Sequence, residues 1–187
     1  MDRVGLPSRD FSGTRFPGSF LAHRNRSVIL AQNHRKRETK PVDETQKQKL
    51  AALLAQEHVA VIVTQGEEWP TATLQAFAET PEFDLLFIMG DTAEKFQNLF
   101  KRPKVTVVVD TRDVGDVAKF QISRSVIQGI ASEVPKGAEW DSLKDLFLAK
   151  NPFESPFFGN PALRLVRIKP KRISYNGADR QAFKVEL

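Results

Sequence analysis

The chain has 187 residues, of which 41% are hydrophobic and 27% are charged, a composition typical of a soluble domain with an apolar core. It contains no cysteine, which excludes disulfides, thiolate metal sites and cysteine nucleophiles and fits a cytoplasmic location. No apolar run is long enough to span a membrane as a helix.

The net charge of +5 is concentrated at the N-terminus. Residues 1–40 hold seven Arg and two Lys against three acidic residues, whereas residues 41–187 hold 19 basic and 20 acidic side chains. A nucleic-acid-binding domain is expected to carry its basic charge on the folded part, so a nucleic-acid partner is not expected. We therefore predict a basic, flexible N-terminal tail, residues 1–40, followed by one folded domain, residues 41–187. Four alternatives for the tail stay open: a transit peptide, an arm that contacts phosphates, a start site assigned too far upstream, and a segment that packs on a partner subunit.

The folded domain is predicted to begin with a helix that runs from Asp43 to about His58. Asp43 is a preferred N-cap residue, and Gln46 stands at the third helical position, where it can return a hydrogen bond to the cap. Three leucines at helical spacing, Leu50, Leu53 and Leu54, mark the face that is expected to be buried.

After this helix the apolar pattern changes to short β-branched runs. Strands are predicted at 58–64, 71–78 and 84–89, separated by short turns. Turns of four or five residues require antiparallel pairing, because a parallel crossover needs about a dozen residues.

The second half of the domain continues the alternation of strands and helices. Asp91 is predicted to cap a short helix that ends before Pro103, and Gly129 is predicted to mark a bend in a long strand. The further predicted elements are a strand at 104–110, a loop at 111–117, a strand at 120–134, a helix at 139–150 and a strand at 163–175. Six mostly antiparallel strands with short helices predict a small closed barrel.

Four short motifs then occur in a fixed order. They are Pro70-Thr71-Ala72-Thr73-Leu74, the apolar run 85–89, the segment Thr92-Ala93-Glu94-Lys95-Phe96-Gln97-Asn98-Leu99, and the strand that follows Pro103 and ends at Asp110. Their order and spacing resemble the pyridoxamine 5′-phosphate oxidase-like split-barrel family over about residues 44–175. This resemblance implies a mainly β fold, a six-stranded antiparallel split barrel of the FMN-binding type flanked by short helices. It also implies a homodimer with FMN in two clefts at the subunit interface.

The resemblance also implies which residues would hold the cofactor. The second strand would lie along the flavin ring and ribityl chain at Thr71, Ala72, Thr73 and Leu74. Lys95 would bind the phosphate at the start of the short helix, where free backbone N–H groups and an ammonium favour an anion.

Three positions depart from the pattern of the pyridoxamine oxidase itself. Met89, Ala93 and Glu94 stand where that enzyme has a threonine and a Ser-Arg pair, so a hydroxyl and a guanidinium are replaced and a carboxylate is added. Each lost charge-assisted hydrogen bond weakens phosphate binding by about 1.5–3 kcal/mol. Arg124 would compensate if it points into the cleft. Pyridoxamine oxidase activity is therefore not expected, and Met89 and Arg124 complete the predicted cofactor-binding set.

Simpler interpretations of the same residues remain open. Lys95 would then be a surface lysine paired with Asp91 or Glu94, and the strand threonines would be ordinary half-exposed residues. Asn98 is expected to act as a local cap or to bond the backbone. The aromatic loop 153–159 would cover the flavin, line a substrate pocket, or plug a barrel end or dimer seam; Trp140 is expected in the core.

The function predicted from these features is that of an FMN-dependent flavoprotein oxidoreductase with a small-molecule substrate or electron donor. The flavin would carry the redox chemistry, and no side chain is nominated as an acid or a base. The alternatives are a non-catalytic binder and a haem- or deazaflavin-binding split-barrel protein. Two of the three histidines, His23 and His34, lie in the predicted tail, and His58 is expected to be structural, so a haem ligand is not favoured. No metal site is predicted.

Overall fold

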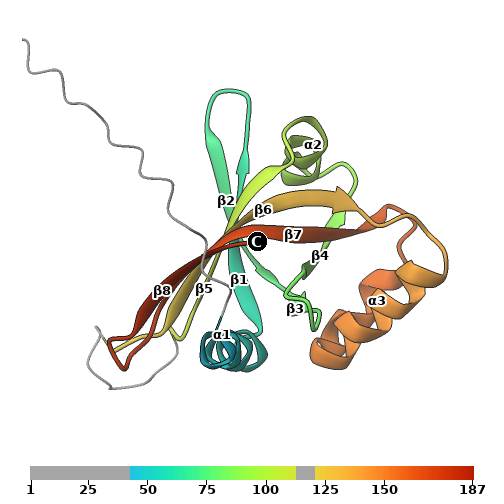
Figure 1. Cartoon of the computed structure of the whole chain (residues 1–187). Helices are drawn as coiled ribbons and strands as arrows, with labels where there is room; N and C mark the ends of the chain where they lie inside the picture. The colour runs from blue at the N-terminus through green and yellow to red at the C-terminus, as the bar shows by residue number, and fades with distance from the viewer. Residues whose placement is uncertain (1–42, 113–120) are drawn as a thin grey trace, which may run out of the picture. The chain divides into compact units, whose positions relative to one another are not determined.

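The computed structural model describes residues 43–112 and 121–187, which form a mainly β structure flanked by short helices (Figure 1). The predicted tail and most of the predicted loop 111–117 lie outside these ranges. The elements in chain order are α1 Glu44–Gln56, β1 Val59–Gln65, β2 Pro70–Ala76, β3 Ala78–Glu79, β4 Leu85–Gly90, α2 Glu94–Lys101, β5 Lys104–Asp110, β6 Arg124–Glu133, α3 Ala138–Lys150, the 3-10 helix η1 Pro152–Gly159, β7 Leu163–Asn176 and β8 Ala182–Glu186.

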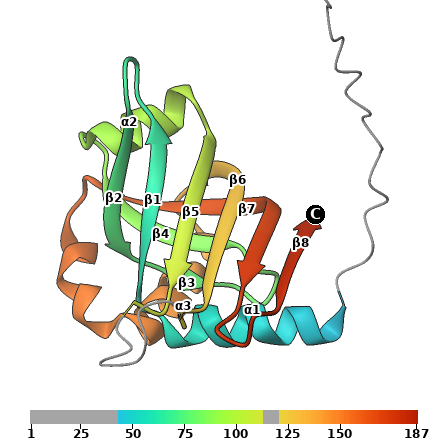
Figure 2. The ribbon, with the colours of Figure 1, turned by 90° about the vertical axis from the view of Figure 1, so that its left-hand side faces the viewer.

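The strands form one antiparallel sheet in the order β2-β1-β5-β6-β7-β4-β3, with β8 paired to β7. The sheet curls, so that β2 and β4 approach each other although no strand ladder joins them (Figure 2). The Gln75 side-chain nitrogen donates to the Ile88 carbonyl at 3.0 Å across this seam. The structure is therefore a split barrel, open between β2 and β4, rather than the closed barrel that the strand pattern alone predicted.

The core lies inside the curl, where each strand turns every second side chain inward. Ile62, Phe87 and Val107 are fully buried there. Helix α1 adds its three predicted leucines at one end of the sheet, and α2 adds Phe96 and Leu99 near the other end (Figure 2). Helix α3 buries Trp140, as predicted, and Phe147 in a second apolar cluster against β4 and β7.

The structure has two more strands in its described part than the six predicted. Both are short: β3 has two residues, and β8 forms a hairpin with β7 that buries only Val185. Strand β6 begins at Arg124, later than the predicted residue 120. The predicted aromatic loop 153–159 is largely the 3-10 helix η1. These segments are too short for hydrophobic periodicity to distinguish them from turns.

The bend predicted at Gly129 is confirmed as a shift in register between β6 and β7. A Cβ at this position would lie 2.5 Å from the Lys169 carbonyl oxygen, which is backbone and cannot move aside easily. We expect Gly129→Ala to lower the free energy of unfolding by about 1–3 kcal/mol, measured by urea denaturation. An unchanged midpoint would show that the β6–β7 bend yields readily.

Candidate functional site

Among the described residues, no side chain caps the first turn of α2. The sequence predicted that Asp91 would do so, and this prediction is wrong: the N-cap residue is Ala93. The Asp91 carboxylate is held instead by Arg164 of β7, at 2.6 Å. The first backbone N–H groups of a helix have no acceptor within the helix, so the start of α2 keeps free donors and the positive end of its dipole.

The beginning of β2 lies beside this helix start. The Thr71 hydroxyl donates to the Glu94 carboxylate at 2.9 Å, which joins the strand to the first residue of α2. Asn98, one helical turn later, donates to the Thr64 hydroxyl of β1 at 3.3 Å. The prediction of a local cap or backbone bond for Asn98 is therefore wrong, because its side chain ties α2 to the sheet. These bonds bring Thr71 and Lys95 to one end of the barrel.

Lys95 occupies the second position of α2 and is half-buried. Within residues 43–112 and 121–187 its ammonium has no hydrogen-bond or salt-bridge partner, since Asp91 is paired with Arg164 and Glu94 accepts from Thr71. Burial lowers the pKa of Lys95 below its ordinary value of 10.5. A half-buried cation without a counter-ion is unfavourable, and a bound anion would relieve that cost.

The four predicted residues of β2 divide between the two faces of the strand, because side chains alternate. Thr71 and Thr73 are half-buried, whereas Ala72 and Leu74 are exposed, Leu74 to 56%. Among the described residues, the buried Thr73 hydroxyl and the side-chain carbonyl of Gln75 have no hydrogen-bond partner. Buried polar atoms are normally paired, so β2 has capacity for further hydrogen bonds.

Within one chain, the side chains of Met89 and Arg124 do not reach the site formed by the start of α2 and β2. The Met89 side chain is 2% exposed and belongs to the main core cluster, so only its backbone remains for a ligand. Arg124 pairs with Asp110 at the far end of β5. Most of the length of that strand, about 15–20 Å, separates it from the Thr71 end of the sheet.

Sequence reasoning missed an apolar row on the outward face of the sheet. Leu74, Val61, Val108 and Val126 are directly paired across β2, β1, β5 and β6, and none of the four is fully buried. The sequence predicts a β-branched strand at 58–64 and, at 104–110, a strand that is buried in its valine-rich middle. The alternating burial of β1 and β5 shows that the described residues leave one face of each strand only partly covered.

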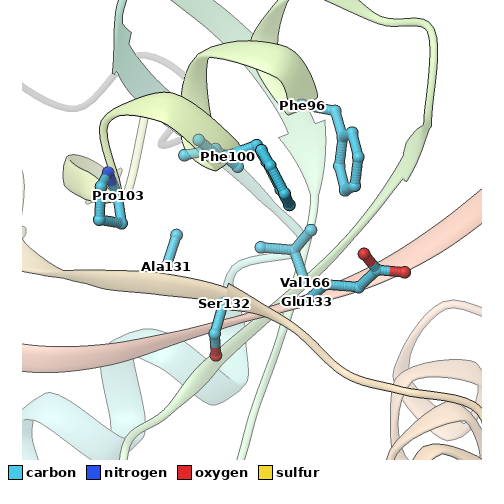
Figure 3. Close-up of a pocket in the computed structure, with 8 residues that line it drawn as sticks. Phe96, Phe100, Pro103, Ala131, Ser132, Glu133 and Val166 are labelled. Atoms are coloured by element: carbon cyan, nitrogen blue, oxygen red, sulfur yellow. The ribbon is translucent and has the colours of Figure 1, made fainter.

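A groove of about 230 Å³ separates α2 from β6 and β7 (Figure 3). Phe96 and Phe100 project into it from the helix, and Ala131 and Val166 lie on the strand side. The Phe100 side chain is 80% exposed. The groove is lined mainly by apolar side chains, and Lys95 is not one of its lining residues.

The structure also shows where the remaining sequence candidates, the aromatic residues of η1 and His58, lie. In η1, Phe158 packs against Trp140 and Phe147, whereas Phe153 and Phe157 are exposed. His58 lies between α1 and β1, where its carbonyl accepts from the Phe77 N–H. The described residues contain no group of three metal-ligating side chains, and none of their helices has the length and hydropathy that a membrane crossing requires.

No protein-family model matches the sequence, and no curated protein matches it significantly. Solved structures do share the fold. A haem-binding protein from Mycobacterium smegmatis matches with a TM-score of 0.69 and 15% identity, over 78% of this chain and 60% of that one, so the chain spans about three fifths of that protein. A protein from Listeria innocua assigned as a pyridoxamine 5′-phosphate oxidase matches with a TM-score of 0.53 and 20% identity, over 69% of this chain and 96% of that one. An FAD-binding protein from Mesorhizobium loti matches with a TM-score of 0.57 and 16% identity, over 68% of this chain and 90% of that one.

Proposed function

From the premise that this chain is a split-barrel protein of the pyridoxamine 5′-phosphate oxidase-like fold family, we propose that it is an FMN-binding oxidoreductase that acts as a homodimer. The observation that carries the proposal is the half-buried Lys95 ammonium, which has no partner among the described residues and lies at the start of α2, where none of them provides a side-chain cap. A phosphate at this position would accept hydrogen bonds from the helix N–H groups and neutralise the ammonium.

The residues around Lys95 fit a phosphorylated flavin. Thr71 and Thr73 place hydroxyls on the strand next to α2, and the buried Thr73 oxygen has no partner among the described residues. The exposed Ala72 and Leu74 offer an apolar surface to a flat ring. The Glu94 carboxylate would repel the phosphate. Because this carboxylate accepts a hydrogen bond from the Thr71 hydroxyl, the repulsion is reduced.

When bound, FMN would supply the redox chemistry, and this chain would bind and orient it. Lys95 and the first turn of α2 would fix the phosphate end, and β2 would support the ring. A small organic molecule would serve as substrate or electron donor. The cysteine-free composition supports a reducing compartment, and we place the protein in the cytoplasm.

The proposed dimer uses the outward apolar row of Leu74, Val61, Val108 and Val126. A sheet face of this kind is normally covered, and a second copy covers it symmetrically because each subunit presents the same row. Val59, at 37% exposure, extends the row toward α1. Arg124 lies on the same face of β6 as Val126 and therefore faces the proposed interface. In the dimer it would reach a cofactor that is bound at the partner subunit.

A second candidate is haem binding, which the likeness to the M. smegmatis haem-binding protein favours. A planar haem would need an axial ligand, and His58 is the histidine that the structure describes, with an exposed ring at the α1–β1 junction. It lies at the α1 end of the sheet, whereas Lys95 lies at the α2 end. The two candidates therefore predict ligands at different places.

Titration of the purified protein with FMN, riboflavin and haemin tests the proposal. We expect the fluorescence of FMN to be quenched when it binds the protein. FMN should bind more tightly than riboflavin by about tenfold or more, because riboflavin lacks the phosphate that Lys95 would hold. Equal affinities for the two flavins would contradict the phosphate site. A sharp haem Soret band with no flavin binding would favour the second candidate.

A further inference from the structure

A second concavity lies on the outward face of the sheet. It has a volume of about 570 Å³ and spans β1, β2, β5, β6, β7 and β8. Its floor is the row in which Val63, Thr106, Gln128 and Arg172 pair across neighbouring strands. The bend at Gly129 shifts the register of β6 against β7, and Gly129 and its two neighbours in β6 line the concavity. We call this feature the β6–β7 groove.

The charges of the β6–β7 groove are strongly unequal. Lys104, Lys171 and Arg172 line it, against Glu186 as the acidic residue. Within the described ranges, neither Lys104 nor Lys171 has a hydrogen bond or a salt bridge to another side chain. Arg172 donates through Nε and Nη2 to a single Glu186 oxygen, at 3.2 and 2.9 Å, which leaves its Nη1 without a partner in the same part of the chain.

Neutral hydrogen-bonding groups complete the lining. Gln65, Thr106 and Gln128 place amides and a hydroxyl among the cations. A concave surface with an excess of two positive charges and several neutral polar groups suits a ligand that carries more than one negative charge. The groove differs in this from the apolar row beside it.

We propose that the β6–β7 groove is a binding site for a small multivalent anion, such as the phosphate or polycarboxylate part of an organic substrate. A nucleic acid is a poorer fit, because the basic residues gather at one place and residues 41–187 carry a net charge of −1. The site does not depend on the flavin proposal, since none of its lining residues belongs to α2.

The β6–β7 groove lies next to the proposed flavin site but is separate from it. Its lining includes Pro70, which directly precedes Thr71 on β2. Lys104 follows the C-terminal end of α2, and the length of that helix, about 10 Å, separates it from Lys95. An anionic substrate held in the groove would therefore lie next to the beginning of the strand that is proposed to support the flavin.

Isothermal titration of the full-length chain with inorganic pyrophosphate tests the site. We expect wild type to bind with an affinity that falls as salt is added, and the double variant Lys104→Gln/Lys171→Gln to bind about tenfold or more weakly. The control is Lys184→Gln, which removes an exposed lysine of β8 that does not line the groove. It should bind like wild type. Circular dichroism and light scattering establish that each variant keeps its fold and oligomeric state.

Three results would overturn the proposal. One is that wild type fails to bind pyrophosphate, including the case in which it binds only single-stranded RNA. Another is that the double variant and the Lys184→Gln control bind equally well. The third is that FMN displaces pyrophosphate one for one and that Lys95→Met abolishes both, since the anion would then occupy the α2 site. If pyrophosphate binds as expected while FMN does not bind at all, the groove stands and the flavin proposal fails.

Discussion

Replacing Lys95 by methionine should weaken FMN binding by about 1.5–3 kcal/mol, because the phosphate loses a charge-assisted hydrogen bond. Methionine keeps most of the aliphatic volume, so α2 should remain packed. The same variant should be more stable than wild type without cofactor, because it removes a half-buried ammonium that has no partner among the described residues. Fluorescence titration gives the first quantity and thermal unfolding of the apoprotein the second.

Two comparisons separate this explanation from a general disturbance of α2. Riboflavin binding should be nearly the same in wild type and Lys95→Met, since riboflavin has no phosphate. Glu94→Gln should shift FMN affinity the opposite way, because it removes the carboxylate that opposes the phosphate at the helix start. Superimposable FMN titrations for wild type and Lys95→Met would show that the phosphate lies elsewhere.

The pH dependence of FMN affinity and of apoprotein stability also tests the role of Lys95. Burial lowers the pKa of Lys95 in the folded protein, so the ammonium is lost at a lower pH than for an ordinary lysine near 10.5. FMN affinity should therefore fall as the pH is raised through the alkaline range, and Lys95→Met should lack this fall. Between the folded and unfolded pKa values the unfolded chain binds more protons, so apoprotein stability due to Lys95 should rise with pH in that window.

Introducing a charge at Leu74 should convert the protein from a dimer to a monomer. Leu74 is 56% exposed in the single chain and opens the apolar row through Val61, Val108 and Val126. In a symmetric dimer, Leu74→Asp places two unpaired carboxylates in the interface, and burying such a charge costs about 3–5 kcal/mol. Light scattering at several protein concentrations measures the change in mass.

The control for Leu74→Asp is Ala52→Asp, an equal charge on the exposed side of α1, which should leave the mass unchanged. FMN binding should also weaken in Leu74→Asp, because Leu74 is proposed to support the flavin ring as well as the interface. A wild-type protein that is monomeric at micromolar concentration would refute the interface directly. A Leu74→Asp variant that remains fully dimeric would place the interface on another face.

The parts of the fold that local chemistry determines were predictable. Asp43 does cap α1 by accepting from the Thr45 N–H, and α3 does end at Lys150 before Asn151-Pro152. The alternating runs became strands because β-branched side chains pack well on a pleated surface. In each case the deciding residues are neighbours in sequence.

The errors come from contacts between residues that are distant in sequence. Asp91 has the right residue type for a cap, but it lies two residues before the N-cap Ala93, and Arg164, 73 residues away, holds its carboxylate. Lys95 has no ion-pair partner in the described part of the chain, and this follows from that same contact and from the Thr71–Glu94 bond. The outward row was missed because a valine-rich strand has the same sequence whether a helix or a second subunit covers it.

The Arg164 contacts have a consequence for the speed and selectivity of binding. Arg164 holds Asp91 at 2.6 Å and also lies 3.4 Å from Glu133 of β6, so the segment that leads into α2 is fastened to two strands of the rigid sheet. The helix tip is thus already shaped before any ligand arrives, and capture needs no folding of a loop around it. An anion site built on this tip would distinguish molecules by whether their anionic end fits a fixed set of donors, which favours a narrow range of ligands over a broad one.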